Sequence, residues 1–166
     1  NEFVSFEGFY QYDWEKTDET LLAFTRDLIR LRLEHPVFMR RGWFLGRAIH
    51  GSGVEDIGWF TPDGIEMAEE NWGEGFAKSI AVFLNGSAIR YPDLRGEKIV
   101  DDSFLLLFNA HHESIPFALP GPEWGKQWVR VLDTAEGDFI DDEKAYPAKE
   151  EIPVQGRALV LLMRNE

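Results

Sequence analysis

The chain has 166 residues, of which 17 are lysine or arginine and 30 are aspartate or glutamate, so its formal net charge is -13. A charge of this sign repels phosphate backbones and anionic headgroups, and we therefore expect no nucleic-acid partner and no membrane partner. The sequence contains no cysteine, which excludes disulfides, thiolate catalysis and cysteine-based zinc sites. The length suffices for one core of ordinary size but not for a complete (β/α)8 barrel.

The first seventeen residues are rich in aromatic side chains, namely Phe3, Phe6, Phe9, Tyr10, Tyr12 and Trp14. A free tail would hardly expose so many rings, so we expect this segment to pack against another body. The segment has neither the basic start nor the apolar centre of a signal peptide, and the sequence has no apolar run of the ~20 residues that span a bilayer. We expect a soluble protein with a cytoplasmic location.

Residues 17–35 have the pattern of an amphipathic helix. Thr17 or Asp18 offers an N-cap, and Pro36 ends the pattern. The apolar residues recur at spacings of three and four as Leu21, Phe24, Leu28 and Leu31, with Leu22, Ile29 and Leu33 widening the stripe. This apolar face is broad for a helix on a single small sheet. The helix either simply covers such a sheet or belongs to a larger body.

From Trp43 onward, short apolar runs alternate with Gly, Pro, Asp and Asn, which is typical of antiparallel all-β domains. The predicted strands are Ile57–Thr61, Ser79–Asn85, Phe104–Asn109, Ile115–Leu119, Gln127–Asp133 and Ala158–Met163. Several, such as 80–84, are apolar on both faces and need cover on both sides, as central strands or under the helix. The acidic stretch 136–143 is interpreted as a solvated loop.

Catalytic and metal-binding chemistry is not evident in the sequence. Adjacent carboxylates such as Asp101 and Asp102 are expected by chance among 30 acidic residues, so we identify no catalytic residue. His111 and His112 join two strands, and neighbouring side chains there usually point apart. With no third ligand at a recognisable spacing, we expect a hairpin turn, no metal site and no cofactor.

The tryptophans divide into two groups. Trp59 and Trp128 are flanked by apolar residues in predicted strands, which favours the core. Trp72 lies in the polar loop 69–75, which is poor material for a buried strand. We expect the Trp72 ring to be exposed or at an interface.

Nearly the whole chain from Tyr12 resembles the C-terminal region of bacterial isoamylase-type glycogen-debranching enzymes, which belong to the α-amylase superfamily. The runs that carry the resemblance are 12–15 (YDWE), 21–26 (LLAFTR), 35–38 (HPVF), 57–60 (IGWF), 62–64 (PDG), 82–86 (VFLNG) and 101–111 (DDSFLLLFNAH). Each run alone is weak, but their ordered combination is specific.

The resemblance implies a parent enzyme that hydrolyses α-1,6 branch linkages in glycogen or its limit dextrins by a retaining mechanism. Its Asp nucleophile, Glu acid/base and stabilising Asp lie in a barrel outside this sequence, so none is carried over to a position here. The implied fold is an antiparallel β-sandwich preceded by a helix left over from a (β/α)8 barrel. The implied partners are the barrel of the same polypeptide and, through the parent enzyme, branched α-glucan.

We therefore predict that residues 1–43 are the tail of a catalytic barrel and that residues 44–166 are a C-terminal β-sandwich. On this hypothesis the fragment itself is non-catalytic and stabilises the barrel, and Trp72 and Trp14 are its candidate contacts with carbohydrate or with the barrel. The alternatives are a free-standing carbohydrate-binding module and a purely structural β-sandwich. The helix at 17–35 favours the first hypothesis, because a free module needs no barrel-type helix.

Overall fold

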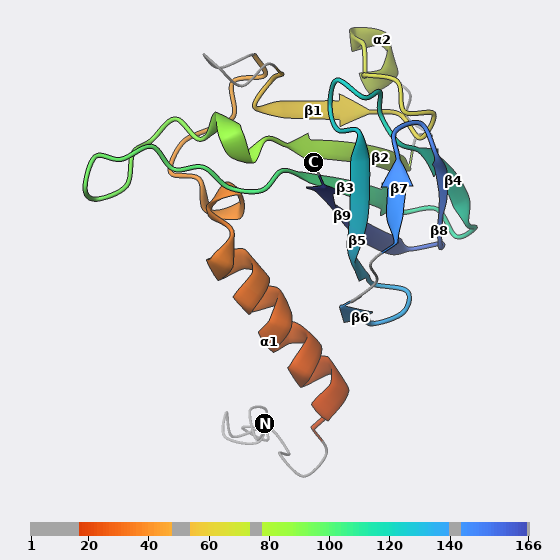
Figure 1. The fold of residues 1–166 in the computed structure, drawn as a ribbon. Helices are drawn as coiled ribbons and strands as arrows, with labels where there is room; N and C mark the ends of the chain where they lie inside the picture. The colour runs from red at the N-terminus through yellow and green to blue at the C-terminus, as the bar shows by residue number, and fades with distance from the viewer. Residues whose placement is uncertain (1–16, 48–53, 74–77, 140–143, 166) are drawn as a thin grey trace, which may run out of the picture.

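The computed structural model describes residues 17–47, 54–73, 78–139 and 144–165, and they form three layers (Figure 1). The middle layer is a seven-stranded sheet. The order of its neighbouring strands is β1 (Ile57–Phe60), β2 (Ser79–Leu84), β3 (Phe104–Asn109), β9 (Ala158–Asn165), β5 (Gln127–Asp133) and β6 (Asp138–Phe139). Strand β7 (Ala145–Pro147) also pairs with β5. A second sheet of β4 (Ile115–Ala118) and β8 (Glu151–Val154) covers one face. Helix α1 (Glu19–Glu34) lies on the other.

The mainly antiparallel β architecture with a preceding helix is confirmed. All strand pairs are antiparallel, and all six predicted strands are present with ends within one or two residues. The two sheets of the sandwich are very unequal, since one has seven strands and the other two. The domain division at residue 43 stays a prediction.

Helix α1 begins and ends as its sequence predicts. Asp18 is the N-cap, and its carboxylate accepts hydrogen bonds from the backbone N–H groups of Thr20 and Leu21, both at 3.0 Å. His35 is the C-cap, and Pro36 opens a short 3₁₀ turn, Pro36–Met39. Among the described residues, no helix combines the length and apolar character needed to cross a bilayer.

Three strands were not predicted, each for a different reason. The loop interpretation of the acidic stretch 136–143 is wrong for β6, because Gly137, at φ +71°, closes a tight turn that pairs Asp138 and Phe139 with β5. Strand β8 carries Pro153, which argues against a strand, but it forms a two-stranded sheet in which Pro153 lies opposite Pro116 of β4. Strand β7 has three residues, too few for a periodic signal.

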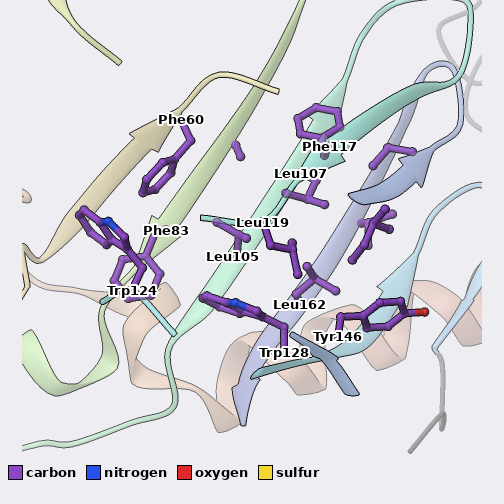
Figure 2. Close-up of a cluster of buried hydrophobic side chains, with 14 of the residues drawn as sticks. Phe60, Phe83, Leu105, Leu107, Phe117, Leu119, Trp124, Trp128, Tyr146 and Leu162 are labelled. Atoms are coloured by element: carbon purple, nitrogen blue, oxygen red, sulfur yellow. The ribbon is translucent and has the colours of Figure 1, made fainter. Parts of the chain in front are cut away.

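The central strands are apolar on both faces because each face has its own cover. Toward β4 and β8 lies a core built around Phe83, Leu105, Trp128 and Leu162 (Figure 2), each of them fully buried. The alternate side chains of the same strands meet the residues that precede β1, and the fully buried Phe104 belongs to that second cluster. The expectation that strands such as 80–84 need cover on both sides is confirmed.

Helix α1 and the sheet are joined by polar contacts at the C-terminal end of the helix. The Asp101 carboxylate meets the His35 ring, Nδ1 to Oδ1, at 2.9 Å, and it accepts the Val37 N–H at 2.9 Å. Further along, the Arg40 guanidinium pairs with the Asp56 carboxylate at 3.1 Å, with the two side chains 7% and 0% exposed. These contacts fix where the helix leaves the sheet.

The buried pair Arg40–Asp56 makes a direct prediction about stability. Asp56→Asn should lower the free energy of unfolding by about 3–5 kcal/mol, because it leaves a buried guanidinium without its counter-charge. Urea denaturation of the chain measures this loss. The control is Asp27→Asn, which breaks the exposed Arg30–Asp27 pair at 3.0 Å and should cost less than about 1 kcal/mol. Equal losses in the two variants would contradict the assignment.

Candidate functional site

An exposed pair of tryptophans lies at the β1 edge of the large sheet. Along β1, Gly58 and Phe60 point into the core toward β4 and β8, and Trp59 points to the opposite face, where it is 36% exposed. Gly58 is required there, because a Cβ at this position would lie 2.8 Å from the Trp124 ring. The strand thus places the Trp59 ring at the surface.

The segment after β1 folds back along the outer edge of that strand. Gly64, at φ +73°, closes the turn, and the Thr61 N–H donates to the Ile65 carbonyl at 2.9 Å. The Met67 N–H then donates to the Trp59 carbonyl at 2.8 Å. This return path leads directly into the short helix α2 (Glu69–Trp72).

Helix α2 sets the second ring against the first. The Asn71 side chain accepts a hydrogen bond from the Ala68 N–H at 2.8 Å and so closes the first turn. Trp72, at the end of α2, is 56% exposed, and its ring meets the Trp59 ring at 5.4 Å between centroids with 73° between the planes. The two indoles form the walls of an open corner.

The structure places Trp59 and Trp128 in different environments, although the sequence favoured the core for both. Trp128 is fully buried, as predicted, but the prediction that Trp59 belongs to the core is wrong. An apolar strand sequence does not reveal that β1 is an edge strand whose outer face is uncovered at Trp59. Trp72 is exposed as expected, whereas its contact with carbohydrate or with a barrel stays a prediction, and Trp14 lies outside the described residues.

Helix α1 carries the second candidate surface, because it is apolar on two sides. At about 100° per residue, Phe24, Leu28 and Leu31 share the side that packs on the sheet cluster. On roughly the opposite side are Leu22, Ile29 and Leu33, which are 40%, 56% and 61% exposed. Among the described residues of α1 none is fully buried.

The N-terminal part of α1 and the tryptophan corner lie at opposite edges of the sheet. Helix α1 contacts β6, and the Phe24 and Phe139 rings meet at 6.0 Å. The tryptophan corner belongs to β1, five strand spacings away, which is about 24 Å at about 4.8 Å per spacing. One small ligand therefore does not engage both the corner and the N-terminal part of α1.

The buried carboxylates serve the fold. Asp56 accepts hydrogen bonds from the Leu45 and Gly46 N–H groups in addition to Arg40, and burial lowers the pKa of Arg40 while Asp56 opposes that change. Asp133 accepts from the Ala135 N–H at 2.9 Å and pairs with Arg130 at 3.3 Å. These groups are engaged acceptors, and none is aimed into a cavity as a general acid would be.

Glu55 is the one described carboxyl group with a clear pKa shift. Its partial burial raises the pKa above the usual range for glutamate, and the nearby carboxylates of Glu66 and Asp56 raise it further. Its charged form is therefore disfavoured in the folded chain.

Residues 56–163 match the family model described as isoamylase, C-terminal. The chain is 45% identical over 157 residues to the glycogen operon protein GlgX homolog of Mycobacterium tuberculosis (strain ATCC 25618 / H37Rv), covering 92% of this chain and 22% of that protein. It is 26% identical over 125 residues to the isoamylase of Pseudomonas amyloderamosa, covering 75% of this chain and 14% of that protein. The chain thus spans about a fifth of the curated relatives' length or less.

A solved structure shares the fold. The pullulanase type I from Bacillus subtilis str. 168, complexed with maltose, superposes with a TM-score of 0.59 and 20% sequence identity, and the alignment covers 98% of this chain and 18% of that one. At this identity the likeness concerns the fold alone.

The raised pKa of Glu55 predicts a pH-dependent variant. The folded chain binds the Glu55 proton more tightly than the unfolded chain, so Glu55 makes stability fall as pH rises through the interval between its ordinary and its raised pKa. Glu55→Gln should therefore raise the free energy of unfolding at pH 7 and should lose this advantage below about pH 4, where wild-type Glu55 is protonated in both states. Urea titrations at both pH values test this, and an equal difference at both would refute it.

Proposed function

Since this chain belongs to the isoamylase C-terminal family, we propose that it is the accessory domain of a glycogen-debranching enzyme and that it packs on the catalytic barrel of the same polypeptide. The proposed parent activity is retaining hydrolysis of α-1,6 branch linkages in glycogen or its limit dextrins. The chain itself contributes no catalytic group in this proposal. We place the function in the cytoplasm, with which a chain lacking cysteine is compatible.

The observation that carries the proposal is the second apolar stripe of α1. A helix that lies on one sheet at the surface needs only one apolar side, whereas a helix between two bodies needs two. Leu22, Ile29 and Leu33 face away from the sheet at 40–61% exposure. A barrel helix that keeps its sheet contact and turns its other side toward barrel neighbours has this pattern.

The tryptophan corner is the proposed site of any direct glucan contact. Indole faces stack on the apolar faces of sugar rings, and Trp59 and Trp72 present two rings at 73°. Because the corner lies at the sheet edge opposite the N-terminal part of α1, a body that packs on that part of the outer stripe need not reach it. The proposal therefore favours glucan over barrel as the partner of Trp72.

A free-standing carbohydrate-binding module is the alternative function. It would use the tryptophan corner in the same way, but it gives no reason for the outer stripe of α1. The experiments on the two surfaces separate these functions.

The outer stripe predicts a context-dependent loss of stability. Ile29→Gln should change the free energy of unfolding of this chain by less than about 0.5 kcal/mol, because Ile29 is 56% exposed. We next consider a chimera in which this chain replaces the matching 157 residues of the Mycobacterium tuberculosis relative. In this chimera the same change should lower the free energy of unfolding by about 1–3 kcal/mol and should lower the melting temperature accordingly.

Ile65→Gln is the matched control, since Ile65 is 65% exposed in the turn after β1. It should have little effect in either protein. An Ile29→Gln chimera as stable as the parent chimera would count against barrel packing through α1 and would favour the free-standing module.

The tryptophan corner predicts that loss of the Trp72 ring weakens glucan binding. Trp72→Ala in the chimera should weaken the binding of a branched dextrin by about 1–3 kcal/mol, by analogy with aromatic stacking on nucleobases. Affinity electrophoresis in gels containing dextrin measures the change, and a thermal melt is run in parallel. A lower melting temperature with unchanged affinity would assign Trp72 to a barrel contact, and no change in either quantity would eliminate both roles.

A further inference from the structure

The turn between β3 and β4 brings three potential metal ligands together. The His111 and His112 rings lie 4.3 Å apart between centroids with 32° between their planes, so these neighbours do not point apart as the sequence suggests. The Glu113 carboxylate lies 3.9 Å from His111 Nδ1 and 4.0 Å from His112 Nε2. One ligand atom of each residue falls within 4.8 Å of the other two.

The backbone of this turn is held in place by a buried side chain. Asn109, which is 2% exposed, donates from Nδ2 to the carbonyls of Glu113 at 2.8 Å and Val154 at 3.0 Å. Its Oδ1 accepts the His111 N–H at 2.9 Å. The turn is therefore tied to β8 and to itself by a single residue that is shielded from water.

The neighbouring turn between β8 and β9 locks the same residues from the other side. The Arg157 N–H donates to the His111 carbonyl at 2.8 Å. Gly156 approaches so closely that a Cβ at this position would lie 2.3 Å from the His112 carbonyl oxygen. Fixing the backbone in advance lowers the entropic cost of gathering ligands around an ion.

A hydrogen bond within the turn orients the His111 ring. The Glu113 N–H donates to His111 Nδ1 at 3.1 Å. A metal at this nitrogen would release the Glu113 N–H to solvent, to which the turn is open, since the His112 and Glu113 side chains are 65% and 71% exposed.

We propose that His111, His112 and Glu113 form a site for a divalent transition cation, with Zn²⁺ as its representative. Ligands at about 2.0–2.1 Å from a tetrahedral zinc ion lie about 3.4 Å from one another. The observed separations are 3.9 Å from His111 Nδ1 to Glu113 Oε2 and 4.0 Å from His112 Nε2 to Glu113 Oε1, and rotation of the exposed His112 and Glu113 side chains can shorten them. Two imidazoles and a carboxylate favour Zn²⁺, Cu²⁺ or Ni²⁺ over Mg²⁺ and Ca²⁺, and the remaining coordination positions are open to water.

The second histidine and carboxylate group, His35 with Asp101 and Asp102, serves a different purpose. Both oxygens of Asp101 are engaged, one with the His35 ring and the other with the Val37 N–H. This group joins helix α1 to the sheet, so it is the natural comparison for the exposed turn.

The test is calorimetric titration of the chain with ZnCl₂, together with thermal melts at rising zinc concentration. We expect one Zn²⁺ per chain and a melting temperature that rises with zinc. His112→Asn and Glu113→Gln replace exposed side chains and should each weaken zinc affinity about tenfold or more, since even loss of an outer-shell partner costs 10–100-fold. Their melting temperatures without zinc should equal that of the parent chain.

Two controls place the ion. Asp102→Asn removes the exposed carboxylate of the other group, and His50→Asn removes a histidine outside the described residues, so both should leave zinc affinity unchanged. The proposal is overturned if the parent chain binds no zinc at millimolar concentration, or if binding survives both His112→Asn and Glu113→Gln. It is also overturned if binding is lost in either control variant.

Discussion

The buried carboxylate of Asp56 is the contact on which the arrangement of the layers depends. It accepts hydrogen bonds from the Arg40 guanidinium and from the Leu45 and Gly46 N–H groups, which belong to the segment that leaves α1. Arg40 in turn donates to the carbonyls of Asn85 and Ala88, at the end of β2. One ion pair thus ties the exit of the helix to the first two strands, and the buried charge is tolerated because both terminal nitrogens of Arg40 and both oxygens of Asp56 have partners.

With the helix fixed in this way, the large sheet contributes side chains to a hydrophobic cluster on each of its two faces. Phe83 and Leu105 face the core toward β4 and β8, whereas Val82 and Phe104, their neighbours in sequence, face the cluster toward α1. Neither layer is complete without the strands between them. Helix α1 also has two apolar sides. Its second apolar stripe, which faces away from the sheet, resembles the one that packs against the sheet.

The elements with strong periodic or capping signals were predictable from the sequence. Asp18 and Pro36 bound α1 because a side-chain acceptor and a fixed φ act locally. The short strands β6 and β7 were not predictable, since their pairing depends on β5, which is distant for β7 and reached for β6 only through the turn at Gly137. Strands of two or three residues are too short to show a periodic pattern in the sequence.

The candidate site was predicted only in part, and the reason is again nonlocal. The polar surroundings of Trp72 indicate exposure, but nothing near Trp59 in the sequence reveals that its strand is first in the sheet. The same holds for the turn at His111, His112 and Glu113, whose side chains converge because Asn109, Gly156 and Arg157 shape the backbone. The residue types were enough to predict most of the helices and strands, whereas the positions of the exposed surfaces depend on the order of the strands in the sheet.

The return of residues 65–67 along β1 also governs how the molecule meets copies of itself. An edge strand with free N–H and C=O groups is a template on which another chain can add a strand. Here the Trp59 carbonyl and the Thr61 N–H already have partners in that segment, and Phe60 is bridged to Glu66. At Trp59 and Thr61, beside the two exposed aromatic rings, main-chain groups that an added strand would use are therefore already paired within the chain.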